Sequence, residues 1–449
     1  MAGDEKTSGD SRSYALPLRL NFSWTFVGNV VWAVSQWGML KVLAKIEPSE
    51  GVMVGCFARG IAIATPVVVF AGLQLRAVQA TDAKREYRFA DYMGLMTINS
   101  VLALVVILGI VLCFGYQGEA ALVIIFVGIA KIFETLSEII FGLLQQHERM
   151  DHIAKSMMTK GIMSLVVMGT LAYLTHSVLW GAAGMAVVLF LRFIGYDARC
   201  AANLLKQYPQ APEADQPSAD SGWSQLRPRW DSGTLLRLAW LALPMGCVAT
   251  LISLNTNIPR YFVEGYMGEG ALGVYSALAY VAIAGNTVVN ALAHAATPRL
   301  AQYYAAGRLP AFYRLTWIVT GISLAMSIAS VLVVGLFGGT VLKLLYAEQY
   351  AKYTDAFMWS TLVGCLYFIG TPLAAATNAK RMFRIQVPIH VGKIIVISAL
   401  CPYLIPKYGL IGAMWSLFVS SLLAVIGYAV AAIYPVRSAE TTPVIIQEE

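Results

Sequence analysis

Three charged residues stand in the middle of an apolar stretch, VGIAKIFETLSEIIFGLLQQHERM, which covers residues 127–150. Lys131, Glu134 and Glu138, together with Gln145, fall within about 60 degrees of one another on a helix that turns about 100 degrees per residue. Lys131 can form an ion pair with Glu134 three positions later, whereas Glu134 and Glu138 repel each other. One of the two carboxylates therefore needs a second cation or a proton.

Further polar residues lie inside apolar stretches, where an ionised group costs roughly 2.5 to 3.5 kcal/mol. The candidate cations besides Lys131 are Arg59, Lys393 and Arg260, and the weaker polar candidates are Asn29, Gln36, Asn255, Asn257 and His294. In a functional interpretation they line a wet cavity in which cations meet an anionic substrate. In a structural interpretation they form salt bridges and hydrogen bonds that fix helix packing. The sequence leaves both interpretations open.

The elements that position these residues are long apolar blocks. Of the 449 residues, 58% are hydrophobic and only 13% are charged, which is about half the charge of an ordinary soluble protein. A helix that spans about 30 Å of hydrocarbon needs roughly 20 apolar residues in a row. Because lipid offers no hydrogen-bond partners, these blocks must be helices, and the alternating strands of a barrel are not seen. We predict an all-α polytopic membrane protein.

About twelve spans are predicted, in two groups of six. Their approximate ranges are 18–40, 52–76, 93–115, 119–145, 157–176, 178–198, 234–258, 270–295, 312–338, 354–377, 386–405 and 409–434. The predicted organisation is an N-terminal tail (1–17), a first six-helix lobe (18–198), a Pro- and Asp-rich linker (199–233), a second six-helix lobe (234–434) and a C-terminal tail (435–449). An offset of 218 residues aligns Gly28 with Gly246 and Gly55 with Gly273. This faint match indicates two parallel repeats with a cavity between them.

Basic residues are concentrated in every second connection, which predicts that both termini are cytoplasmic. The net charge of +7 then reflects topology and anionic lipid, not nucleic acid. The six cysteines are scattered singly without a CxxC or a nearby histidine, so no metal site is predicted. There is no GxxxxGK[ST], HExxH or GxSxG motif, and the outer connections are short. We therefore expect a protein that is not an enzyme.

Several stretches resemble one protein family. The stretch GLLQQHERMDHIAKSMMTKG (142–161) resembles the junction of the fourth and fifth helices of bacterial polysaccharide transporters. Residues 253–301, with Pro-Arg-Tyr, Leu-Gly-x-Tyr-Ser and Pro-Arg-Leu, resemble the seventh and eighth helices, and NFSWTFVGNVVWAVSQWGML resembles the first. Over nearly its whole length the chain resembles the oligosaccharide-lipid (Wzx-like) flippases of the multidrug, oligosaccharidyl-lipid and polysaccharide exporter (MOP) superfamily.

The resemblance implies a V-shaped transporter in the bacterial inner membrane that alternates between inward-open and outward-open forms. Its substrate would be an oligosaccharide repeat unit linked through pyrophosphate to undecaprenol, moved to the periplasmic leaflet for O-antigen, capsule or exopolysaccharide synthesis. Other polysaccharide-assembly proteins would be partners, and no cofactor is implied beyond a coupling proton or Na⁺. From their positions, we assign Arg59, Lys131, Lys393 and Arg260 to the pyrophosphate, and Glu134 or Glu138 to coupling.

Aromatic residues have two interpretations as well. Trp24, Trp32, Trp37, Tyr275 and Tyr280 could stack on sugar rings, or they could anchor helices at the membrane interfaces. The nearly balanced intramembrane charge favours a neutral glycan that is bound through its pyrophosphate.

Two other functions are open. A MATE-like exporter of small cations would need a cavity dominated by carboxylates. A membrane-embedded polymerase or transferase would need catalytic carboxylates outside the lipid.

Overall fold

The computed structural model describes residues 18–46, 51–82, 85–208, 222–380, 382 and 385–433, and these ranges contain helices and connections but no strand. The two predicted tails and the middle of the predicted linker, 209–221, lie outside the described residues. The long helices of the N-terminal half are α1 (Leu18–Ile46), α2 (Val52–Gly72), α4 (Phe89–Cys113), α5 (Gly118–Gln146), α6 (Met150–Thr175) and α7 (Val178–Arg192). Those of the C-terminal half are α9 (Ser232–Ala305), α10 (Leu309–Leu345), α11 (Thr354–Ala379) and α12 (Gln386–Ile433).

Two of these helices are in fact pairs. The backbone of α9 breaks at Gly268 (φ 83°) and that of α12 at Gly409 (φ 57°). Glycine adopts positive φ without the steric penalty that a Cβ atom would bring, so each position allows the chain to turn sharply between two helices. When both pairs are counted as two, the described residues contain six long helices before the linker and six after it. The predicted fold class is confirmed.

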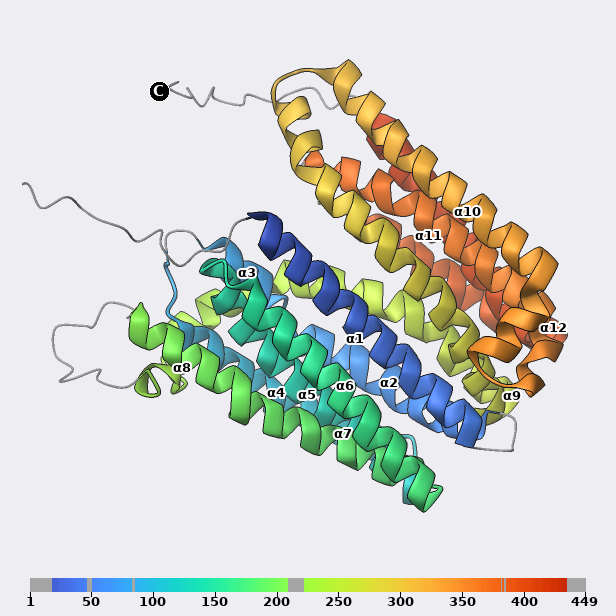
Figure 1. Ribbon diagram of the computed structural model, residues 1–449, viewed down its shortest axis with the longest axis horizontal. Coiled ribbons are helices and arrows are strands. Elements are labelled where there is room, and N and C mark those ends of the chain that lie inside the picture. Colours follow the sequence, from blue (N-terminus) through green and yellow to red (C-terminus); the bar gives the residue numbers. More distant parts are fainter. Residues whose placement is uncertain are drawn as a thin grey trace, which may run out of the picture.

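The helices form two bundles (Figure 1). We call α1–α8 the first lobe and α9–α12 the second lobe. The two bundles diverge toward the end of the molecule where α1 begins and α12 ends, which we call the termini end. At the opposite end they meet, and Lys41 Nζ of α1 donates to the Leu344 carbonyl of α10 over 3.1 Å.

The start of α2 and the start of the second half of α9 lie against each other, and this contact displays the internal repeat. A Cβ atom at Gly55 would lie 2.0 Å from the Glu269 carbonyl oxygen, and a Cβ atom at Gly273 would lie 1.9 Å from that of Gly51. The offset of 218 residues found in the sequence maps Gly51 onto Glu269 and Gly55 onto Gly273. The same contact is therefore made twice, as expected at a two-fold axis between repeats.

The first lobe extends beyond its predicted end at residue 198. The chain leaves α7 through the π-helical turn η1 (Phe193–Asp197) and continues as α8 (Ala198–Gln207). The beginning of the predicted linker is thus helical, because Ala201, Leu204 and Leu205 are buried against the lobe. Three further short elements are α3 (Leu75–Thr81), η2 (Ser224–Leu226) and η3 (Glu348–Tyr353).

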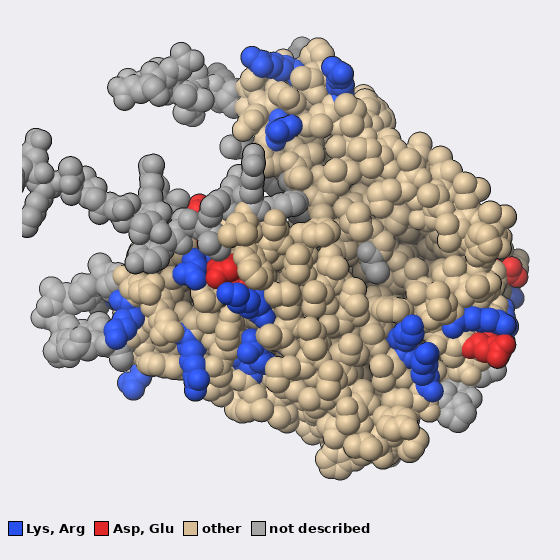
Figure 2. Space-filling view, viewed as in Figure 1, with Lys and Arg blue, Asp and Glu red and all other residues tan. Residues whose placement is uncertain are grey.

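The surface has the charge distribution of a membrane protein. On the face shown in Figure 2, charged side chains gather at the two ends, and a broad zone between them carries none. In the described part, nine helical stretches, with α9 and α12 each counted once, are long and apolar enough to cross a membrane. Large apolar side chains such as Leu112 and Leu336 are 79% and 74% exposed, as expected for side chains that face lipid. The chain is a multi-pass membrane protein.

Candidate functional site

The polar face of residues 127–150 lines a pocket in the first lobe. The pocket has a volume of about 770 Å³ and lies between α2, α3 and α5. Its charged and amide side chains are those of Arg76, Lys131, Glu134, Glu138, Gln74 and Gln145. Lys131, Glu134, Glu138 and Gln145 thus share one face of α5, as the helical spacing predicts.

Every charge in this first-lobe pocket has a partner. Lys131 Nζ lies 2.8 Å from Glu134 Oε2, which is the predicted pair. Arg76 Nη1 lies 2.6 Å from Glu138 Oε2, and Arg76 Nε donates to Gln145 Oε1 over 3.2 Å. Arg76 is the second cation that the sequence required for the remaining carboxylate. It was not predicted as a site residue, because in the sequence it lies in a connection rich in basic residues. In the structure, the short helix α3 folds back beside α5 and brings Arg76 into the pocket.

Behind this pocket the polar interior of the first lobe continues. Gln36 of α1 lines a smaller pocket with Lys131 and Glu134. Nearby, the buried carboxylate of Asp197 accepts hydrogen bonds from Ser137 Oγ (2.8 Å) and Ser156 Oγ (2.6 Å). Asp197 was missed because it lies at the predicted end of a span, where a carboxylate is ordinary.

The second lobe places two cations around one tyrosine. Lys393 of α12 is buried, and its Nζ lies 5.5 Å from the ring centre of Tyr367. Arg260 of α9 lines a narrow pocket of about 20 Å³ with Tyr275 and Tyr367, which is room for about one water molecule. Arg260 Nη1 donates to Asn257 Oδ1 over 3.0 Å. Within the described ranges, neither Arg260 nor Lys393 has a carboxylate at salt-bridge distance.

Uncharged groups complete this second-lobe cluster. Asn255 Nδ2 lies 3.0 Å from His390 Nδ1, and the Tyr428 hydroxyl lies 3.2 Å from His390 Nε2. The sequence identified Asn255 and Asn257 but not His390, which was not recognised among the apolar residues of the eleventh predicted span.

The remaining predicted residues lie elsewhere. Arg59 enters neither pocket, because its guanidinium is paired with Glu264, and its Nη2 lies 3.3 Å from Glu269 Oε2. Both carboxylates belong to α9, so this triad joins the two repeats near the end opposite the termini. Asn29 is exposed and donates to the Thr25 carbonyl of its own helix. His294 lies on α9, and its side chain is outside the described part.

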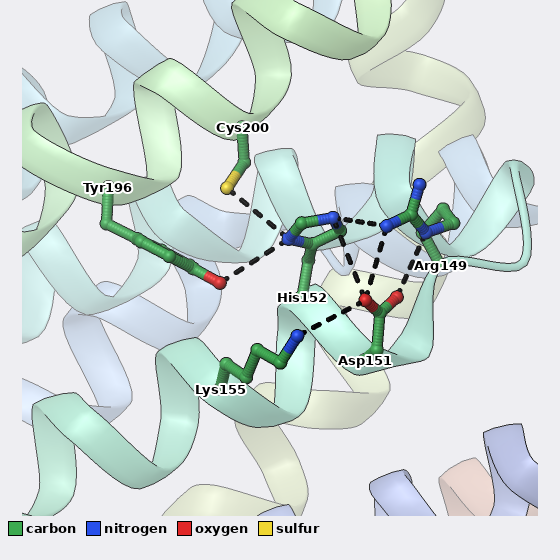
Figure 3. Close-up of polar contacts among 6 residues, drawn as sticks. All are labelled: Arg149, Asp151, His152, Lys155, Tyr196 and Cys200. Carbon is green, nitrogen blue, oxygen red and sulfur yellow. Dashed lines mark hydrogen bonds and ion pairs between the residues drawn. The ribbon is translucent and has the colours of Figure 1, made fainter.

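The junction that carries the family resemblance forms a polar network of its own (Figure 3). Asp151 accepts two hydrogen bonds from Arg149, over 3.0 and 3.2 Å, and lies 3.6 Å from Lys155 Nζ. His152 Nδ1 lies 3.4 Å from the Tyr196 hydroxyl. These contacts join the start of α6 to the π-helical turn η1 and therefore tie together two helix ends of the first lobe.

The chain is similar in sequence to a known protein and in fold to several solved transporters. No family model matches the chain. The capsular polysaccharide biosynthesis protein CapF of Staphylococcus aureus is 25% identical over 413 residues, which cover 91% of this chain and 97% of that protein. A multidrug resistance MATE family transporter of the MOP superfamily, solved in outward-facing and inward-facing conformations, superposes with a TM-score of 0.61. The two conformations are 14% and 13% identical to the chain over 91% of its length and 93% of theirs.

A MOP superfamily transporter from Pyrococcus furiosus, described as having a binding pocket of reverse polarity that suggests a different function, is also similar. Its TM-score is 0.61 at 15% identity, over 91% of this chain and 93% of that one. The chain therefore has the fold of these solved transporters, and its sequence is similar to that of a capsular polysaccharide biosynthesis protein.

Proposed function

We propose, from the premise that this chain is a polysaccharide-related transporter of the MOP superfamily, that it is a lipid-linked oligosaccharide flippase. It moves undecaprenyl-pyrophosphate-linked repeat units from the cytoplasmic to the periplasmic leaflet of a bacterial inner membrane by alternating access. The product feeds the synthesis of a surface polysaccharide, and other polysaccharide-assembly proteins receive it. In this proposal the termini end faces the cytoplasm.

The observation that carries the proposal is the pair of cations in the second lobe. Arg260 and Lys393 lie among tyrosines and amides, with no carboxylate at salt-bridge distance in the described ranges. An unpaired cation at membrane depth is costly, so a protein retains it where it meets an anion. A pyrophosphate offers that negative charge and accepts charge-assisted hydrogen bonds from both side chains. The narrow pocket beside Arg260 would have to widen when the substrate enters.

The unequal contacts between the two repeats suit a substrate with a lipid tail. Along α2 and the first half of α9, contacts extend from Leu73 against Gly246, through the Tyr261 hydroxyl bonded to the Ala62 carbonyl, to the Arg59 triad. The repeat-related helices α1 and the second half of α9 meet where the Tyr280 hydroxyl donates to the Ala33 carbonyl over 3.0 Å. From there they diverge toward the termini end (Figure 1). A prenyl tail could remain in lipid beside this divergence while the head enters.

The first-lobe pocket would serve coupling. We propose that Glu134 or Glu138 exchanges a proton or Na⁺ as the lobes change orientation. A movement of α3 against α5 could withdraw Arg76 from Glu138, and a rotation of the Lys131 side chain could release Glu134. A MATE-like exporter of small cations has less support, because both carboxylates of the pocket are already neutralised by Lys131 and Arg76.

The proposal is tested by reconstituting the full chain in liposomes that carry an undecaprenyl-pyrophosphate-linked oligosaccharide. We expect the glycan to become accessible to an enzyme on the far side of the membrane at a rate well above that of protein-free liposomes. The matched control is Lys343→Gln, which removes an exposed cation paired with Glu348 and should transport at the normal rate. A rate equal to that of empty liposomes would refute the flippase. In cells, a deletion strain should accumulate lipid-linked repeat units, and normal surface polysaccharide in that strain would count against the proposal.

A further inference from the structure

We infer that the junction of α6 with the π-helical turn η1 holds a binding site for the phosphate group of an anionic membrane lipid. The site consists of Arg192, Lys155 and Arg149, arranged around Tyr196 and His152 near the termini end of the first lobe. Figure 3 shows these residues except Arg192, which stacks on the ring of Tyr196. It lies outside the two interior clusters, and its existence does not depend on which substrate the protein transports.

Arg192 has hydrogen-bond donors that the described residues leave unused. Its guanidinium carbon lies 4.3 Å from the ring centre of Tyr196, one helical turn later on the same face. The Nε and one Nη atom of Arg192 are buried and have no hydrogen-bond partner among the described residues. Buried charged donors without an acceptor are costly. Because Nε and Nη of a guanidinium point in parallel, a phosphate with two oxygens satisfies both at once.

The surrounding charges add to this attraction. Asp151 is the acidic residue of the network in Figure 3, and it is shared among Arg149, His152 and Lys155. Arg149 occupies both carboxylate oxygens of Asp151, so Lys155, whose side chain is 47% exposed, is paired only at 3.6 Å. The three cations Arg149, Lys155 and Arg192 outnumber the two carboxylates near them, Asp151 and Asp197, so the cluster keeps a net positive charge.

The orientation of the phosphate donors is held by the network itself. His152 faces the Tyr196 hydroxyl at 3.4 Å and the Cys200 thiol at 3.7 Å through the same Nδ1 atom. These contacts fix the tyrosine ring against which Arg192 is stacked. The π-helical turn, a geometry that recurs at functional sites, places Tyr196 where both contacts are possible.

The neighbouring surface indicates that the phosphate belongs to a lipid. Phe190, Leu191 and Ile194 flank Arg192, and their side chains are 40%, 58% and 47% exposed. A cation at the end of a spanning helix lies at headgroup depth, and apolar side chains beside it can contact acyl chains. A soluble phosphate would use the cations but not this apolar surface.

The test measures lipid binding to the purified full chain in detergent by native mass spectrometry, with phosphatidylglycerol and phosphatidylcholine as the probes. We expect phosphatidylglycerol to bind more tightly, and Arg192→Ala and Lys155→Ala each to weaken it about fivefold without changing phosphatidylcholine binding. Arg192→Lys keeps the positive charge but loses the paired donors of the guanidinium. This variant should bind phosphatidylglycerol with an affinity between those of the unmodified protein and Arg192→Ala. The matched control is Arg314→Ala, which removes an exposed cation of α10 and should have no effect.

Two competition arms identify the source of the phosphate. Displacement of phosphatidylglycerol by undecaprenyl phosphate, but not by inorganic phosphate, would show that the site also takes the carrier lipid. Displacement by millimolar inorganic phosphate alone would overturn the assignment to a lipid. Equal affinity for the two phospholipids, or an equal loss in Arg192→Ala and Arg314→Ala, would overturn the site itself. Thermal unfolding of each variant without added lipid separates these outcomes from misfolding.

Discussion

The interiors of the two lobes handle their charges in different ways. In the first lobe, Lys131 is paired with Glu134 and Arg76 with Glu138, at 2.8 and 2.6 Å. In the second lobe, Arg260 and Lys393 are surrounded by tyrosine rings and amides, and the described ranges place no carboxylate beside either of them. Two lobes related by an internal repeat have therefore diverged in charge, one balanced and one positive.

This difference separates two interpretations that the sequence left open. A charge that the protein itself neutralises can be explained by packing, because its partner offsets part of the cost of leaving water. A buried cation without a counter-charge is not offset in this way, and in the flippase proposal it meets an anion that arrives from outside. We therefore assign the headgroup of the proposed substrate to the second lobe. We interpret Lys131 as the ion-pair partner of Glu134 and not as a substrate-binding residue.

The largest effect is expected when both second-lobe cations are removed. Arg260→Gln with Lys393→Gln should lower the initial rate of translocation in liposomes at least about 100-fold, because each charge-assisted hydrogen bond contributes about 1.5–3 kcal/mol. Lys131→Gln should lower the rate far less. A double variant that transports within twofold of the normal rate would contradict the assignment of the headgroup to the second lobe.

The sequence could predict features that are local to one helix, but not contacts between helices. The all-helical membrane fold followed from length and hydropathy, because lipid forces every spanning segment to satisfy its backbone hydrogen bonds within itself. The Lys131–Glu134 pair was predictable because both residues are on one helix. The Arg76–Glu138 pair, 62 residues apart, and the Asn255–His390 contact, 135 residues apart, depend on how helices pack, which no local spacing encodes.

The prediction for Arg59 shows the same limit. Its position within a span was evident from the sequence, and a salt bridge was one of the open interpretations. Its partners Glu264 and Glu269 flank the turn at Gly268, and only the approach of α2 to α9 brings them to the guanidinium. The sequence could thus identify which residues are unusual at membrane depth, but not which of them face one another.

A second way to sharpen the comparison uses stability. Lys131→Met leaves the Glu134 carboxylate without its partner in a partly buried site, and should lower the free energy of unfolding by about 2 kcal/mol. Lys393→Met removes a buried cation that has no carboxylate partner in the described ranges, so we expect no loss or a small gain in stability. Thermal unfolding of both variants in the same detergent measures the difference.

The control for this prediction removes both charges of the pair. Lys131→Met with Glu134→Leu should recover most of the stability lost in the single variant, since no unpaired charge remains. A Lys393→Met variant that is less stable than Lys131→Met would reverse the comparison, because it would show that the second-lobe cation has a structural partner.

The smallest effect is expected for the other pair of the first lobe. Arg76 and Glu138 side chains are 33% and 34% exposed, so water screens their attraction, and Arg76→Gln should cost less than about 1 kcal/mol. Because an exposed pair is also screened by ions, this loss should shrink at about 0.5 M salt, whereas the loss in Lys131→Met should persist. If Arg76→Gln and Lys131→Met lose equal stability at low and at high salt, the two ion pairs are equally shielded from solvent. A proton or Na⁺ from solvent would then not reach Glu138 more readily than Glu134.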